Sequence, residues 1–136
     1  MNYFLDTSAC VAILRRRPES VRVKAEKAIR QGSTLLISSV VLHELWYGVF
    51  KGSRVEENVW RLQAFLAWGV EVLHFDENDT RVSGEIRAEF EAGGNRIGAY
   101  DTLIGGQCLR HELTLVTNNL SEFSRIRGLK CVDWAK

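Results

Sequence analysis

The 136-residue sequence contains one proline, three cysteines and almost no net charge, and each scarcity excludes a class of protein. The cysteines (Cys10, Cys108 and Cys131) are odd in number and show no C-x-x-C spacing, so they predict small apolar fillers in a reducing compartment rather than a disulfide framework. Lys and Arg number 18 against 17 Asp and Glu, a formal net charge of +1. Binding of long phosphate stretches by charge alone is therefore excluded, and any contact with nucleic acid must be local or metal-assisted.

The sequence also lacks long hydrophobic runs. No unbroken apolar stretch approaches the ~20 residues that span a bilayer. The first residues, Met-Asn-Tyr-Phe-Leu-Asp, show no basic start followed by an apolar stretch, so no signal peptide is predicted. With 46% hydrophobic and 26% charged residues, the composition is that of a globular protein. We expect one domain spanning residues 1–136, in a soluble cytoplasmic protein.

Hydrophobic periodicity predicts an α/β fold. Short apolar runs predict strands at residues 3–5, 35–37, 70–73, 113–116 and 129–132. Between them, helical spacing predicts helices over about 7–15, 19–30, 40–50, 55–66, 79–90 and 99–109. Thr7 or Ser8 is the expected cap of the first helix, and Pro18 is expected in the first turn of the second. This alternation predicts one domain with a central, mostly parallel sheet flanked by helices on both faces.

Four acidic residues lie where such a fold collects ligands, outside the carboxyl ends of the strands. Asp6 directly follows the first predicted strand, and Glu122 follows the fourth after the stretch Val116–Asn119. Asp101 lies at the start of a helix, while Glu44 is embedded in a strongly apolar one. Like charges gathered at one sheet edge require a cation, and an all-oxygen site suits Mg²⁺ or Mn²⁺ rather than zinc.

Each acid also has an ordinary structural interpretation. Asp6 is placed to cap a helix, Asp101 to complement a helix dipole, Glu44 to reach solvent from the shoulder of its helix, and Glu122 to be a surface charge. Taken together, the four acids favour a metal site over these four separate structural interpretations. The sequence shows neither a P-loop nor a G-x-G-x-x-G motif, and the pair Gly105-Gly106 inside a helix predicts close packing.

Several segments together resemble one known family. They are Phe4-Leu5-Asp6-Thr7-Ser8, Ile37 through Gly48, Ile86-Arg87-Ala88-Glu89, Ile97 through Ile104, Leu115 through Phe123, and Val132-Asp133-Trp134. In order and spacing, over essentially the whole chain, they are similar to the PIN-domain ribonucleases, and within these to the VapC toxins of bacterial toxin–antitoxin pairs.

This resemblance implies a metal-dependent endoribonuclease. Asp6, Glu44 and Asp101 occupy the three acidic positions that hold Mg²⁺ in the family, with Mn²⁺ as a substitute. For the fourth position the resemblance leaves two candidates: many relatives carry Asp where Asn119 stands, whereas the subgroup with an Asn-Asn pair uses the acid that is here Glu122. The implied reaction is attack of water on an RNA phosphate, in line with the bond that breaks, leaving a 5′-phosphate and a 3′-hydroxyl.

The chain departs from the family pattern at two places, and three further residues are supporting candidates. The usual Asn two positions after the first Asp is Ser8 here, and a common Pro is replaced by Ala99. Neither change removes a charge. Ser8 and Asn119 are expected to support the site, and Arg87, on the helix before Asp101, is expected to approach it.

The resemblance also implies partners. These are a small DNA-binding antitoxin of the VapB type, whose C-terminal segment wraps the toxin and blocks the metal site, and a second copy of the toxin. An RNA substrate follows from the activity, with transfer RNA, the initiator in particular, suggested by the subgroup. Arginines 15–17, Lys51, Arg54 and Arg61 are candidate phosphate contacts.

Two rival functions are open at this point. One is a catalytically silent PIN-like module that acts in binding or assembly, which the four retained carboxylates oppose. The other is a phosphatase with Asp6 as its nucleophile. That chemistry requires a second Asp two positions later, where Ser8 stands.

Overall fold

The computed structural model describes residues 1–136 and contains five strands and seven helices. In chain order they are β1 (Asn2–Leu5), α1 (Thr7–Arg15), α2 (Glu19–Arg30), β2 (Thr34–Ser38), α3 (Ser39–Lys51), α4 (Val55–Ala67), β3 (Glu71–Leu73), α5 (Glu77–Ala92), α6 (Ala99–Arg110), β4 (Thr114–Val116), α7 (Leu120–Phe123) and β5 (Lys130–Val132). All five predicted strands and all six predicted helices are present. The short helix α7 was not predicted.

The five strands form one sheet in the order β3-β2-β1-β4-β5, and every neighbouring pair is parallel. The predicted α/β class is confirmed, and the sheet is wholly rather than mostly parallel. After β1 the chain builds outward through β2 and β3, then returns to place β4 on the other side of β1. Strand order therefore reverses between β1 and β4, which is where open parallel sheets bind ligands.

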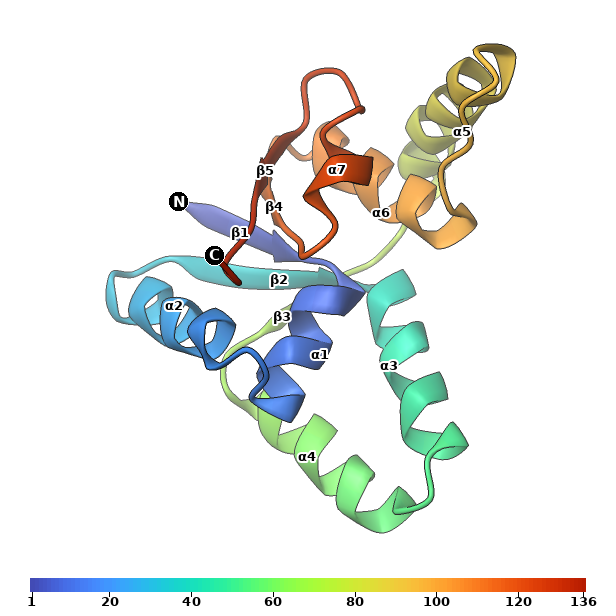
Figure 1. The fold of residues 1–136 in the computed structure, drawn as a ribbon. Helices are drawn as coiled ribbons and strands as arrows, with labels where there is room; N and C mark the ends of the chain where they lie inside the picture. The colour runs from blue at the N-terminus through green and yellow to red at the C-terminus, as the bar shows by residue number, and fades with distance from the viewer.

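Helices cover the sheet on both faces (Figure 1). On one side lie α1, α2 and α4, and on the other α5, α6 and α7, while α3 stands near the edge to which the strand arrows point. Twenty-five buried hydrophobic residues form a single core cluster between these layers. No helix combines the length and the apolar character needed to cross a membrane.

Local chemistry corrects two predictions about helix starts. The cap of α1 is Asp6 rather than Thr7 or Ser8, because its carboxylate accepts the backbone N–H of Ala9. Pro18 is the residue before α2 and not part of its first turn. A four-residue helix such as α7 carries too little periodicity to be recognised from sequence.

Close packing explains the two adjacent glycines of α6. A Cβ on Gly105 would lie 2.6 Å from the Cδ1 of Ile126, and one on Gly106 would lie 2.9 Å from the Cα of Ser83. The predicted packing role of this pair is confirmed, since a side chain at Gly106 would meet the backbone of α5 and one at Gly105 would displace the end of the Ile126 side chain. All three cysteines are free thiols, with Cys10 and Cys108 buried.

Candidate active site at the carboxyl edge of the sheet

The buried carboxylate of Asp6 is the centre of the site. It lies at the end of the central strand β1 and is only 3% exposed. Its Oδ1 accepts the Ala9 N–H at 2.8 Å and the Ser8 hydroxyl at 2.7 Å, and its Oδ2 accepts the hydroxyl of Thr117 at 2.5 Å. Asp6 is thus a helix cap, and this contact does not conflict with its predicted place in the metal site.

Thr117 is the site residue that sequence reasoning passed over. It is fully buried directly after β4, the neighbour of β1, and its hydroxyl also accepts the N–H of Asn119 at 2.9 Å. The register pairs Leu5 with Val116, so Asp6 and Thr117 are the next residues along two adjacent strands. That register was the missing signal, because the sequence alone does not say that β1 and β4 are neighbours.

Ser8 supports the same arrangement from the start of α1. Its hydroxyl donates to Asp6 and accepts the N–H of Asn118 at 3.0 Å. Ser8 therefore joins Asp6 to the loop after β4, and its role as a supporting residue of the site stays a prediction. A carboxylate held by three donors cannot rotate freely, so its orientation is set before any ligand binds.

Glu44 is brought to this edge by α3. The helix begins at the end of β2, next to β1, where the Ser38 hydroxyl caps it by accepting the N–H of Val40 at 3.0 Å. The Oε1 of Glu44 accepts the hydroxyl of Thr7 at 2.5 Å, a contact across 37 residues of sequence. We call the carboxyl edge of the sheet that carries Asp6, Glu44, Asp101 and Glu122 the acidic edge. The two residues that follow β1, Asp6 and Thr7, both contribute contacts to it.

Asp101 and Glu122 complete the acidic edge from the other face of the sheet. Glu122 lies in α7, where its Oε1 accepts the N–H of Gly98 at 2.9 Å and its Oε2 accepts the side-chain amide of Asn119 at 2.6 Å. Asp101, in the first turn of α6, lies beside Glu122, and their carboxyl groups interact strongly enough that each shifts the pKa of the other. Asn119 thus acts on Glu122, as a supporting residue beside it.

The four acids act on one another electrostatically. Burial, then the hydrogen bond and negative charge of Glu122, and then the charges of Asp6 and Glu44 raise the pKa of Asp101 to about 7. Burial also raises the pKa of Asp6 against the hydrogen bonds from Thr117, Ser8 and Ala9. Burial opposes ionisation of Glu122 too, but hydrogen bonds from Gly98, Asp101 and Asn119 outweigh it and lower its pKa.

This donor set fits a divalent cation in its chemistry. All four groups offer carboxylate oxygens, the ligands that Mg²⁺ and Mn²⁺ prefer, and burial together with the negative charges of the other three acids raises the pKa of Asp101. No three acidic, histidine or cysteine side chains lie close enough together to enclose one ion as they stand. An ion at this edge would require side-chain rotations, such as Glu44 turning from Thr7, that draw the carboxylates together.

The raised pKa of Asp101 predicts an unusual stability effect. A raised carboxyl pKa means that the folded protein loses stability as pH rises from about 4 to 7. A shift of this size in a fully buried group corresponds to about 4 kcal/mol, and solvent screening at half-buried Asp101 reduces it to about 1–2 kcal/mol. In EDTA at pH 8, Asp101→Asn should therefore raise the melting temperature by roughly 5 °C.

Thermal unfolding of both proteins from pH 8 to pH 4 checks this prediction. The advantage of Asp101→Asn should shrink on acidification, because the wild-type carboxyl then takes up a proton in the folded state. A variant that melts at the wild-type temperature at pH 8 contradicts it. Glu85→Gln, which neutralises an exposed carboxylate on α5, is the matched control and should show no gain.

Arg87 lies apart from the carboxylates. Its side chain is exposed on α5 and pairs with Glu91 one turn later, with its Nε 2.9 Å from Oε2 of that carboxylate. No hydrogen bond or ion pair joins it to the acidic edge. The expectation that Arg87 approaches the site finds no contact to support it.

A groove extends from Glu44 along α1. Its first part, a hollow of about 240 Å³ between α1, α3 and α4, is lined by Glu44, Arg15 and Arg61 among other residues. The second part, a hollow of about 430 Å³, shares Leu14, Arg15 and Arg61 with the first. We call the two together the α1–α4 groove.

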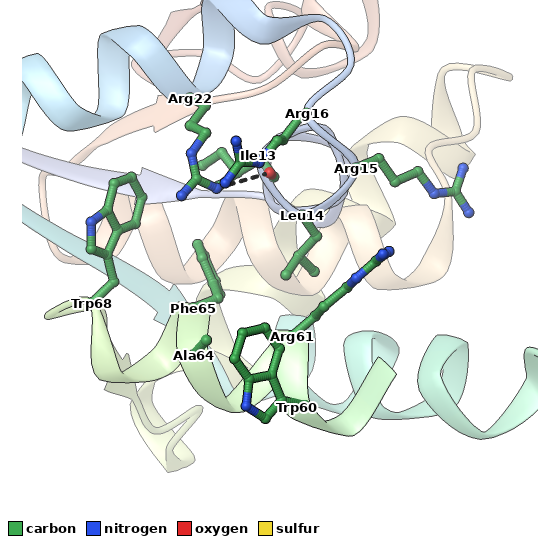
Figure 2. Close-up of a pocket in the computed structure, with 10 residues that line it drawn as sticks. All are labelled: Ile13, Leu14, Arg15, Arg16, Arg22, Trp60, Arg61, Ala64, Phe65 and Trp68. Atoms are coloured by element: carbon green, nitrogen blue, oxygen red, sulfur yellow. Dashed lines mark hydrogen bonds between the residues drawn. The ribbon is translucent and has the colours of Figure 1, made fainter. Parts of the chain in front are cut away.

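The far part of the α1–α4 groove is aromatic on its floor and basic on its rim (Figure 2). It is lined by Ile13, Leu14, Arg15, Arg16, Arg22, Trp60, Arg61, Ala64, Phe65 and Trp68. Trp68 and Phe65 are at least half-buried, and the guanidinium of Arg22 lies 5.2 Å from the centroid of Trp68. Trp60 is 70% exposed, as expected of a tryptophan at an interface rather than in the core.

Comparisons with known proteins agree with this geometry. The model of the PIN domain matches residues 3–129. Ribonuclease VapC2 of Rickettsia felis is 40% identical over 136 residues, all of both chains, and the tRNA(fMet)-specific endonuclease VapC of Salmonella typhimurium is 37% identical over 134 residues, 98% of both. The structure of VapBC2 from Rickettsia felis bound to a promoter DNA fragment superposes with a TM-score of 0.91 at 39% identity, covering 98% of this chain and 99% of that one.

Proposed function

The chain belongs to the PIN-domain family, as one of its VapC ribonucleases, and we propose that it is the toxin of a toxin–antitoxin pair that hydrolyses RNA with the help of Mg²⁺. One observation carries the proposal. Four carboxylates from four different parts of the chain lie at the edge of the sheet beside the reversal of strand order, where burial and the charges of the other three raise the pKa of Asp101 to about 7.

Each residue of the site has a definite part in this proposal. Asp6 and Asp101 hold the ion, with Glu44 and Glu122 in support, and Mn²⁺ is expected to substitute. When bound, the ion supplies positive charge that activates water and stabilises the charge developing on the phosphate. Thr117 and Ser8 fix the orientation of Asp6, and Asn119 that of Glu122. Hydrolysis of this kind leaves a 5′-phosphate and a 3′-hydroxyl and does not need the 2′-hydroxyl.

We propose transfer RNA as the substrate, with the initiator as its first member to test. Two relatives support this choice by their names, the tRNA(fMet)-specific endonucleases VapC of Salmonella typhimurium and Shigella flexneri, at 37% and 36% identity. The Rickettsia felis relative, at 40% identity, is named only as a ribonuclease. The substrate is therefore best identified by mapping the ends of the cleaved RNA.

Cleavage of total cellular RNA by the purified, antitoxin-free protein tests the proposal. With Mg²⁺ we expect discrete products with 5′-phosphate ends, and EDTA should abolish them. Asp6→Ala is the control for a contaminating nuclease. Mapping of the ends then identifies the RNA, and cuts confined to RNA other than tRNA would reject the tRNA proposal alone.

The rival function, a silent PIN-like binding module, makes the opposite prediction. A folded protein that cleaves no RNA with Mg²⁺ or Mn²⁺ and shows no melting shift with either ion would establish that alternative. Because its readout includes ion binding, the experiment separates a silent module from a nuclease whose substrate is missing from the assay.

We further propose a VapB-like antitoxin that occupies the α1–α4 groove. Two structural neighbours above 30% identity are VapBC complexes, from Rickettsia felis and Salmonella typhimurium. The groove begins at Glu44, so a segment lying in it would block the acidic edge. Its aromatic floor fits apolar side chains, and its arginine rim fits an acidic segment.

A second copy of the chain is proposed to pack against α3. The outward face of this helix carries Tyr47 and Phe50, which are 61% and 63% exposed, and Phe50 stacks on Trp46 with ring centroids 5.7 Å apart. Exposed aromatic side chains of this size mark protein interfaces. This face is separate from the α1–α4 groove, so antitoxin and second copy do not compete for Tyr47 and Phe50.

A further inference from the structure

The first turn of α6, which carries Asp101, has no side-chain cap of its own. Its N-cap residue is Gly98, and the preceding residues 93–98 are exposed except for half-buried Ile97. Gly94 in this segment adopts a φ of +74°, a conformation that favours glycine. The position of Asp101 therefore depends on what holds the segment immediately before it.

Two contacts from the α7 region hold that segment. One is the hydrogen bond from Gly98 N–H to Glu122, already part of the acidic edge. The other comes from Arg125, whose Nη2 donates to the backbone carbonyl of Arg96 at 2.9 Å. The two residues that are held, Arg96 and Gly98, lie two positions apart, and their partners, Arg125 and Glu122, lie three positions apart. Because the segment is held at two points, both its position and its direction are fixed.

Arg125 is itself held by three elements. Its guanidinium lies over the ring of Phe90 on α5, 5.1 Å from the centroid, and its Nε donates to the carbonyl of Glu122 at 3.4 Å. The planar group thus joins α5, the segment before α6, and α7. Few side chains other than arginine can stack and donate in several directions at once.

The partners of Arg125 distinguish it from the paired arginines of the chain. Five arginines form ion pairs with carboxylates, namely Arg22, Arg54, Arg61, Arg87 and Arg110. Arg125 instead uses its donors on two backbone carbonyls and forms no ion pair. Because Arg125 donates to backbone carbonyls, it holds the backbone of residue 96 in position, and the chain runs from there directly to Asp101.

We propose that Arg125 is a positioning residue of the ribonuclease site, which holds residues 96–98 against α7 and so sets the separation of Asp101 and Glu122. The inference rests on the proposed function, because that separation matters through the ion the two carboxylates hold. Arg125 acts through the backbone, and nothing in its role requires it to contact RNA.

Mn²⁺ titration of the metal-free, full-length protein by calorimetry tests the inference. Arg125→Met keeps a long unbranched side chain beside Phe90 and removes the donors, and we expect it to weaken Mn²⁺ affinity roughly tenfold. Arg127→Met is the matched control, since Arg127 is an exposed neighbour without a hydrogen bond or ion pair, and it should bind Mn²⁺ like the wild type. Arg125→Lys keeps the charge, should lose affinity in part, and replaces Arg125→Met if that variant fails to fold.

Kinetics separate this role from a direct contact with RNA. For Arg125→Met we expect a higher Mg²⁺ requirement and partial recovery of kcat at high Mg²⁺, with an unchanged KM for RNA. Unchanged Mn²⁺ affinity in both Arg125 variants overturns the inference, as does an equal rise in KM for Arg125→Met and Arg127→Met, which would mark both as phosphate contacts. A wild-type protein that binds no Mn²⁺ overturns the proposed function itself.

Discussion

Replacing Asp101 with asparagine is expected to reduce RNA cleavage at saturating Mg²⁺ by at least about a thousandfold. The carboxyl of Asp101 faces Glu122 and lies within the electrostatic reach of Asp6 and Glu44. An amide of the same shape carries no charge, so it weakens ion binding and the stabilisation of charge on the phosphate, an effect of several kcal/mol. Initial rates of RNA cleavage across a Mg²⁺ titration measure the loss.

The same substitution carries its own control for folding. Because Asp101→Asn is expected to melt at a higher temperature than the wild type without metal, a loss of cleavage cannot be attributed to unfolding. In addition, Mg²⁺ should raise the melting temperature of the wild type and not that of the variant. Full activity in Asp101→Asn would remove this carboxylate from the mechanism.

Replacing Trp60 with alanine is expected to weaken antitoxin binding about 30-fold, the effect of a buried interface tryptophan worth roughly 2 kcal/mol. Trp60 is 70% exposed in the free chain and lines the α1–α4 groove from α4 (Figure 2). Because it is so exposed, its loss should change the free energy of unfolding by less than about 0.5 kcal/mol. Titration of the free toxin with antitoxin, followed by RNA cleavage, measures the affinity.

Val23→Ala is the matched control for this experiment. Val23 is 51% exposed on α2 and does not line the groove, so its removal should leave the affinity unchanged. Trp60→Phe should fall between wild type and Trp60→Ala. If the same antitoxin concentration inhibits Trp60→Ala and the wild type, the antitoxin does not lie against Trp60. If Trp60→Ala instead raises the KM for RNA, the groove binds the substrate.

Much of this protein is determined by its sequence alone. Short apolar runs alternating with amphipathic helices allow little except a parallel α/β sheet, because such strands need both faces covered. The positions of Asp6 and Asp101 at element ends are also local facts, since a carboxylate is favoured at a helix start. Together with the family resemblance, these patterns were enough to name all four acids of the candidate site.

Tertiary structure decided which side chains meet and in what state of charge. Thr117 acts on Asp6 only because β4 returns to the side of β1, a pairing of residues 111 positions apart that no periodicity encodes. Likewise Arg125 reaches Arg96 only because α7 lies against the segment before α6, and α7 itself is too short to leave a pattern. Helical and strand periods record which face of an element is buried, whereas hydrogen bonds and pKa shifts depend on distances between elements, which only the folded chain sets.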